Sequence, residues 1–105
     1  MNIEVRFVHL DSSDALRDHV VARLRSHLDR LDREVTEARV RFTDVNGPKV
    51  GGMRCHVTLS GPHIGQLDAA SEQESAYVAA DESVDAAVHA VVRELDRRRS
   101  MRRAG

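Results

Sequence analysis

EARVRFTDVNGPKVGGMRCHVTL, residues 37–59, is the stretch that decides the fold. Apolar and polar residues alternate on both sides of its centre, which is typical of two strands that each bury one face. The centre, DVNGPKVGG, is rich in Asn, Gly and Pro, residue types that allow the chain to reverse. The stretch therefore predicts a β-hairpin. Its apolar face carries Ala38, Val40, Phe42, Met53, Cys55, Val57 and Leu59, and its open face carries Arg39, Arg41, Arg54 and His56.

A strand and a helix precede the hairpin. Ile3, Val5 and Phe7 alternate with other residues and predict a first strand. The hydroxyl and carboxylate side chains of residues 11–14 can cap a helix, which we expect to begin at about Ser13. An apolar stripe along this helix is formed by Leu16, Val20, Leu24, Leu28 and Leu31. Because strand–helix–strand crossovers are almost always right-handed, the first strand should lie parallel to the second.

The residues after the hairpin predict a loop, a strand and a second helix. Residues 61–74 hold a Gly-Pro cluster and a weakly patterned acidic run, so we expect a long loop there. Residues 75–80 predict a short edge strand with Val78 inward, and the helix should begin at Asp81. Its apolar residues recur at helical spacing, at Val84, Val88, Val91, Val92 and Leu95.

These elements predict one α+β domain at residues 1–98. Their order is β-α-β-β-β-α, and the expected architecture is a four-stranded mixed sheet with two helices packed on one face. Residues 99–105, RSMRRAG, have lost the apolar period, so we expect a basic C-terminal tail that frays. A chain of 105 residues is long enough for one such domain to bury a core without disulfides or metals.

The net charge of -1 conceals a strong polarity along the chain. Six acidic residues fall in a stretch without Lys or Arg, namely Asp68, Glu72, Glu74, Asp81, Glu82 and Asp85. Six arginines crowd the end of the chain, namely Arg93, Arg97, Arg98, Arg99, Arg102 and Arg103. The cationic end predicts phosphate binding driven by counterion release, and the alternative is a solvated tail that keeps the protein soluble.

One flank of the first helix is also cationic. Its residues are spaced by four, four and three, and they are His19, Arg23, His27 and Arg30. Together they would give this flank a positive potential. The alternative is that these side chains lie at the edge of the helix–sheet contact, where Asp18 and Asp29 would partly neutralise them.

The sequence lacks the arrangements that catalysis or a cofactor requires. Cys55 is expected to point inward from the middle of a strand, which does not suit an activated nucleophile. The six histidines show no tight ligand spacing, and no Gly-rich phosphate loop precedes a helix. We therefore expect no enzyme, no metal, no cofactor and no small-molecule substrate. The aromatic content of 3% argues against base stacking, and the lack of a long apolar run argues against a membrane, so we expect a cytoplasmic protein.

Three motifs resemble the ribosome hibernation-promoting factor family, also called ribosomal subunit interface proteins. They are SDALRDHVVARL at residues 13–24, the DVNGPKVGG turn, and DESVDAAVHAVVRELDRRR at residues 81–99. The resemblance covers nearly the whole chain, and the turn is most similar to a subgroup of small ribosome-associated relatives. It implies a domain that binds the small ribosomal subunit at the decoding region, blocks translation and stores the ribosome.

The resemblance also implies a binding site, because family members use basic residues of both helices against ribosomal RNA. The positions that match in type are Arg17 and Arg23 on the first helix and Arg97 on the second. Neighbouring residues and the cationic flank complete the expected RNA-binding set, which is Arg17, Arg23, Arg30, Arg93, Arg97 and Arg98.

Some features depart from the family pattern. Glu94 and Met101 stand where relatives often have lysines, and the expected loop at residues 61–74 is longer and acidic. Both departures should weaken binding to the ribosome. The chain also lacks the second, dimerising domain of the long family members, so we expect no ribosome pairing through that domain.

A protein-binding module is the alternative function. The acidic segment of one copy or partner would meet the arginine-rich end of another, and in the first case the result would be a weak homodimer. Ribosomal RNA or heparin should compete with a phosphate-binding surface but not with a contact made only to protein, so competition distinguishes the two functions.

Overall fold

The computed structural model describes residues 1–45 and 52–104, with the side chains of residues 1–45 and 52–101. In chain order the elements are β1 (Asn2–Val8), α1 (Asp14–Leu28), a short 3-10 helix η1 (Asp29–Leu31), β2 (Glu37–Asp44), β3 (Met53–Gly61), β4 (Gly65–Gln73) and α2 (Ala76–Ala104). This order confirms the predicted β-α-β-β-β-α domain. Residues 46–51 of the expected hairpin turn lie outside the described residues.

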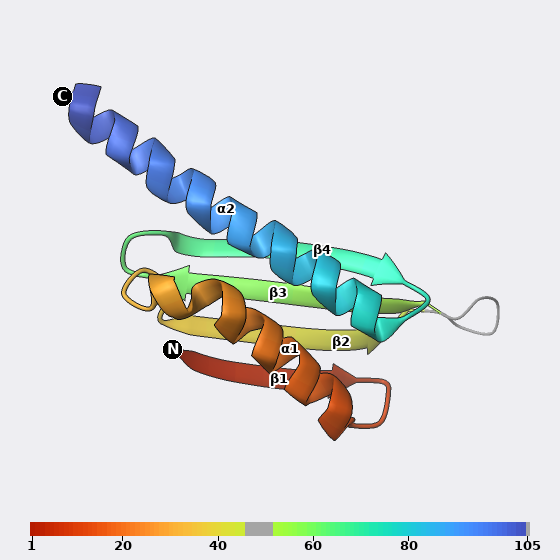
Figure 1. Cartoon of the computed structure of the whole chain (residues 1–105). Helices are drawn as coiled ribbons and strands as arrows, with labels where there is room; N and C mark the ends of the chain where they lie inside the picture. Colours follow the sequence, from red (N-terminus) through yellow and green to blue (C-terminus); the bar gives the residue numbers. More distant parts are fainter. Residues whose placement is uncertain (46–51, 105) are drawn as a thin grey trace.

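The four strands form one mixed sheet in the order β1-β2-β3-β4. β1 pairs with β2 in parallel, and the two later pairings are antiparallel, as the sequence predicts. Val40 lies opposite Val5 on one side and Val57 on the other, so the apolar residues of neighbouring strands share one face. Both helices cover this face and leave the other face of the sheet open (Figure 1).

The core lies between the helices and the sheet. α1 contributes its predicted apolar stripe, and Leu31 of η1 packs partly buried against the same core. α2 contributes mainly small residues, which bring the helix close to the sheet. The buried apolar residues of the two helices are Leu16, Val20, Leu24, Leu28, Ala79, Ala80, Val84, Ala87 and Val91.

Cys55 is buried within this core, as the sequence predicts. Burial raises the pKa of its thiol to about 11, even though a hydrogen bond with Ser83 opposes the shift. The group therefore stays protonated at neutral pH. It acts as a packed core side chain and not as a nucleophile.

The prediction for residues 61–80 is wrong. Residues 65–73 form β4 rather than a loop, and the chain is already helical at Ala76. Val78, expected inward on a strand, is 45% exposed on α2. The inward residues of β4 include Leu67 and Ala69, which are only half-buried, so the strand has a faint apolar alternation. The helix start signal is Ser75, whose Oγ accepts a 3.4 Å hydrogen bond from the Val78 N–H.

α2 is longer than the sheet requires. Its 29 residues correspond to roughly 44 Å of helix at 1.5 Å per residue. Leu95 is the last half-buried residue, and residues 96–101 are all exposed. Figure 1 shows the C-terminal half of α2 projecting beyond the end of the sheet. Residues 99–104, expected as a tail, continue this helix, and their fraying in solution stays a prediction.

Candidate nucleic-acid interface

The projecting end of α2 carries three of the expected RNA-binding residues, Arg93, Arg97 and Arg98. All three are exposed. Arg93 makes no ion pair within the described part of the chain. Arg97 donates to Glu94 across 2.7 Å and 3.1 Å, and Arg98 donates to the same carboxylate across 3.0 Å. One carboxylate therefore serves two guanidinium groups, and the helix end keeps an excess of positive charge.

These contacts also shift the titration of Glu94. The hydrogen bonds from Arg97 and then from Arg98 lower the pKa of this carboxyl to about 2. Glu94 therefore orders two arginines along the helix as well as reducing the net charge of this end. Its carboxylate remains ionised throughout the physiological range.

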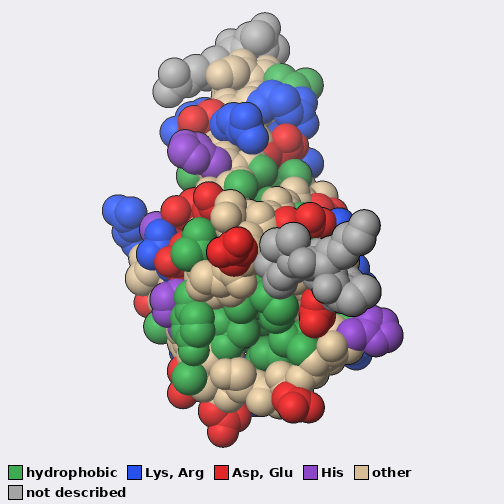
Figure 2. Space-filling view, turned by 90° about the vertical axis from the view of Figure 1, so that its right-hand side faces the viewer, with side chains coloured by type: hydrophobic (Ala, Val, Ile, Leu, Met, Phe, Trp, Pro, Cys, Tyr) green, Lys and Arg blue, Asp and Glu red, His purple; other side chains and the backbone are tan. Residues whose placement is uncertain are grey.

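The arginines of this end point in several directions around the helix axis. With about 100° per residue, Arg93, Arg98 and Arg99 lie on three different sides of α2. Arg99 lies 3.9 Å from Asp96, a long contact between two exposed side chains. Figure 2 shows Lys and Arg side chains gathered on the projecting end. A partner could therefore contact this end from more than one side.

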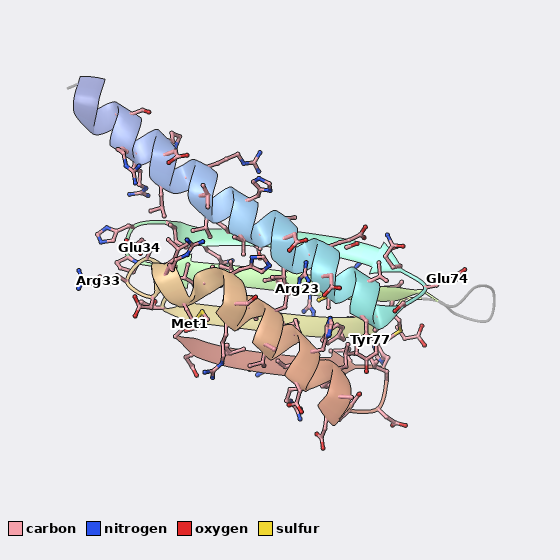
Figure 3. All side chains as sticks on the ribbon, in the orientation of Figure 1. Met1, Arg23, Arg33, Glu34, Glu74 and Tyr77 are labelled. Atoms are coloured by element: carbon pink, nitrogen blue, oxygen red, sulfur yellow. The ribbon has the colours of Figure 1, made fainter. Side chains whose placement is uncertain are left out.

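Arg30, in η1, lies at the same end of the molecule. α1 and α2 run in the same direction across the sheet, so η1 and the projecting part of α2 lie toward the same end of the molecule (Figure 1). Figure 3 places Arg33, in the following loop, at this end too. Both arginines are exposed, and neither makes an ion pair among the described residues. The structure thus places Arg30 at the same end of the molecule as the arginines of α2.

Arg23 has a different environment, because it points from α1 toward α2 (Figure 3). Its Nη2 donates to both carboxylate oxygens of Asp85 at 3.0 Å and 3.1 Å, and its Nε lies 3.5 Å from Asp81. On either side, His19 Nε2 lies 2.7 Å from Asp81 and His27 Nε2 lies 3.4 Å from Asp85. These five residues form an interhelical ladder in which acids alternate with basic side chains.

The ladder changes the interpretation of the cationic flank. The acids that neutralise it are Asp81 and Asp85 of α2, and not Asp18 and Asp29 of the same helix. The sequence prediction missed this pairing because the partners are 62 residues apart, although both sets repeat every four residues. The two aspartates also belong to the acidic segment that the protein-binding alternative requires. Within the domain they already pair with basic side chains of α1.

Arg17 lies on the opposite flank of α1. Its guanidinium carbon is 5.5 Å from the centre of the Phe7 ring in β1, and its Nη1 lies 3.2 Å from Asp14. Arg17 and Arg23 are therefore not brought together. Each has a partner within the domain, whereas Arg30 and Arg93 have no ion pair in the described part.

Two other kinds of site, metal centres and membrane spans, are not formed by the described residues. Within residues 1–45 and 52–104, no group of three His, Cys, Asp or Glu side chains could hold a metal ion. The described helices include none with both the length and the apolar character needed to cross a membrane.

Known structures resemble the whole domain. The N-terminal domain of Protein Y from Thermus thermophilus is 28% identical, with a TM-score of 0.67, and the match covers 89% of this chain and 98% of that chain. A ribosomal subunit interface protein from Coxiella burnetii is 20% identical, with a TM-score of 0.68 and coverage of 95% and 99%, which shows a shared fold. No curated protein matches this chain.

A family model identifies the chain directly. The model described as sigma 54 modulation protein / S30EA ribosomal protein matches residues 3–99. The match runs from β1 into the projecting end of α2 and includes Arg93, Arg97 and Arg98. It confirms the resemblance carried by the three sequence motifs. The chain belongs to the sigma 54 modulation protein / S30EA ribosomal protein family.

Proposed function

We propose that this protein is a ribosome hibernation factor that binds the small ribosomal subunit near the decoding region and inhibits translation. Its family is one of ribosome-associated, non-enzymatic factors, in agreement with the expectation that the chain is not an enzyme. In this proposal the contact is made to ribosomal RNA, the place of action is the cytoplasm, and no cofactor takes part. A homodimer is not required.

The observation that carries the proposal is the arginine-rich end of α2, which projects beyond the sheet. Arg93 is exposed and has no carboxylate partner among the described residues, so phosphate can replace water around it without breaking an ion pair. Each phosphate neutralised by such a group releases counterions, which favours binding to RNA irrespective of sequence. The chain's near-neutral net charge does not oppose this, because the cationic side chains are concentrated at one end.

Within this proposal the six expected residues have two roles. Arg30, Arg93, Arg97 and Arg98 contact phosphate at the shared end of the molecule. Arg17 and Arg23 stabilise the packing of α1 on β1 and on α2. This assignment rests on the partners that each guanidinium has within the domain.

Salt-dependent binding to small-subunit ribosomal RNA tests the proposal. Arg93→Gln should lower affinity and reduce the slope of log affinity against log salt by about 1, because one phosphate contact is lost. Arg25→Gln is the matched control. Arg25 is an exposed helical arginine without an ion pair in the described residues, and it lies on the side of α1 near Met1 and Ile3.

The outcomes separate the proposal from its alternative. If Arg93→Gln and Arg25→Gln bind ribosomal RNA with the slope of the parent, Arg93 does not contact phosphate, and the observation that carries the proposal is lost. If the parent fails to bind ribosomal RNA and heparin but captures an acidic protein surface, the protein-binding module replaces the hibernation factor as the proposed function.

A further inference from the structure

A second group of arginines lies on the open face of the sheet, away from both helices. Two of them have acidic partners on the same face, since Arg39 lies 3.3 Å from Glu37 and Arg54 pairs with Glu72. Residues of β2 alternate between buried and exposed, so Arg39 and Arg41 face away from the core. In β3, Arg54 and His56 do the same. The proposed function above makes no use of this face, which lies on the side of the sheet opposite α2.

The strand register places two arginines directly opposite one another on this face. Arg6 lies directly opposite Arg41, Arg41 lies opposite His56, and His56 lies opposite Ala70. We call these four residues the open-face row. Like charges directly opposite one another destabilise a sheet, and no acid interrupts this row. The adjacent rows do contain acids, since Glu72 lies opposite Arg54 and Asp68 lies opposite Thr58.

The contacts within the row leave Arg41 without a counterion. Among the described residues no carboxylate lies within ion-pair distance of it, and its Nη2 lies 3.5 Å from His56 Nδ1. His56 Nε2 in turn lies 3.0 Å from the Asp68 carboxylate. When the proton of the His56 ring is on Nε2, this N–H donates to the Asp68 carboxylate, and the unprotonated Nδ1 can accept from Arg41. His56 therefore holds Arg41 in place without neutralising its charge.

The other members of the network reinforce this arrangement. Thr58 Oγ1 donates a 2.6 Å hydrogen bond to Asp68, and this contact is the main reason why the pKa of Asp68 lies below its ordinary value. Asp68 thus stays ionised and keeps His56 oriented. Arg6 is paired with Glu4 of its own strand at 2.5 Å, but its side chain is 73% exposed and can turn toward a ligand.

Space for a ligand exists on both sides of Arg41. A hollow of about 400 Å³ is lined by Arg6, Arg39 and Arg41 and also by the acids Glu4 and Asp68. A second hollow of about 440 Å³ is lined by Arg41, Arg54, Ala70 and the acid Glu72. Both hollows share Arg41 and His56. The small side chain of Ala70 leaves the β4 end of the row open.

We propose that the open-face row binds phosphate groups of an RNA backbone, with Arg41 as the main contact and Arg6 beside it. The proposal rests on the proposed function in taking RNA as the source of the phosphates. It adds a second contact surface on the opposite side of the sheet, so the domain would lie between two RNA segments. Guanidinium groups suit this role because their fork of N–H donors matches phosphate oxygens.

RNA fits this face better than a protein partner does. Arg41 has no carboxylate partner among the described residues, so a phosphate can approach it without breaking an ion pair, whereas Arg39 and Arg54 are already paired with Glu37 and Glu72. The face also lacks Phe, Tyr and Trp side chains among its described residues, so it offers no large aromatic platform on which successive bases could stack. The expected contact is therefore to the backbone and independent of base sequence.

Nuclear magnetic resonance can follow this face separately from the end of α2. We would titrate the parent with a short single-stranded RNA of mixed sequence and observe the His56 ring and the Arg41 Nε–H signals. These signals should shift and saturate. The shifts should persist in Arg93→Gln, which removes one of the α2 contacts, and in the control Arg25→Gln. In Arg41→Gln, which has no Nε–H to observe, the RNA-dependent shift of the His56 ring should be lost, and we expect the backbone spectrum to be preserved because position 41 is exposed.

Other results would overturn the proposal. His56 signals that do not move with RNA, or that still move in Arg41→Gln, exclude the row as a phosphate site. Shifts caused by a polyglutamate peptide but not by RNA assign the face to an acidic protein partner instead. If only the signals near Arg93 respond to RNA, the proposed function stands without this second surface. If only the open face responds, the assignment of the α2 end fails while this inference stands.

Discussion

Gly61 allows two backbone segments to approach closely at the end of β3. A Cβ atom added there would lie 1.7 Å from the carbonyl oxygen of Glu34, in the loop that leads into β2. That oxygen belongs to the backbone and cannot turn aside as a side chain could. Any larger residue at position 61 must therefore displace one of the two segments.

We expect Gly61→Ala to destabilise the protein by roughly 1 to 3 kcal/mol, the usual cost of overpacking. Thermal unfolding measures this, and about 1 kcal/mol corresponds to a fall in Tm of about 4–8 °C for a domain near this size. Gly65→Ala is the control, since nothing lies within 4 Å of its added Cβ and only its φ of +67° resists the change. Equal Tm values for Gly61→Ala and the parent would contradict the close approach.

Arg23 provides the second test at a single position. Because its guanidinium is held between Asp81 and Asp85, Arg23→Gln should lower stability while leaving RNA affinity unchanged. The partners are each at least one-third exposed, so the expected loss is only about 0.2 to 1 kcal/mol. Denaturant unfolding and ribosomal RNA binding of the same variant decide this. A loss of RNA affinity as large as that of Arg93→Gln would show that Arg23 is part of the RNA-binding site.

The projecting part of α2 depends on local contacts, because beyond Leu95 no described residue is buried. The ion pairs of Glu94 with Arg97 and Arg98 stabilise this part, and they hold the pKa of Glu94 at about 2, below the ordinary value of about 4.3. Contacts that lower the pKa of a carboxyl group stabilise the folded state, and this stabilisation is fully present when the pH is above the ordinary pKa of the group. That contribution is lost as the pH falls from about 4.3 toward about 2.

We therefore expect the helix signal in far-ultraviolet circular dichroism to fall across this acidic window. Other carboxylates titrate there too, so the informative quantity is the difference between the parent and Glu94→Gln. The variant should have a weaker helix signal at neutral pH and a smaller fall on acidification. Identical acid profiles for the two proteins would show that Glu94 does not stabilise the end of α2.

The elements differ in how well the sequence predicts them. The hairpin strands and α1 have strong periods and a cap at Ser13, whose Oγ accepts from the Leu16 N–H at 3.1 Å, so they were predicted correctly. β4 is an edge strand with a faint alternation, and its pairing with β3 determines its conformation. The start of α2 was missed because residues 75–80 satisfy both a strand and a helix pattern.

The sequence indicates which arginines are candidates for the site, but it does not indicate which groups surround each of them. Sequence spacing placed Arg23 and Arg30 on one flank of α1, yet only the packing of α2 determines which of them meets a carboxylate. The ladder with Asp81 and Asp85 joins residues far apart in the chain, and helical periodicity alone carries no information on that contact. The open-face row likewise depends on strand register, which fixes Arg41 between Arg6 and His56.

The whole molecule is elongated, with extents of 55 × 24 × 17 Å, because α2 projects from one end. The arginine-rich end and the loop between β1 and α1 therefore lie at opposite ends (Figure 1). An orientation on the ribosome follows from this shape. The projecting end should contact RNA of the small subunit, and the β1–α1 loop should not be needed for that contact.

Site-specific cross-linking on purified small subunits tests this orientation most directly. A photoreactive amino acid would replace Met101, which is 61% exposed near Arg97, or Asp11, which is exposed in the β1–α1 loop. We expect cross-links from position 101 to small-subunit ribosomal RNA and few or none from position 11. Cross-links from position 11 alone, or a protein that never enters the small-subunit fraction at low salt, would contradict it.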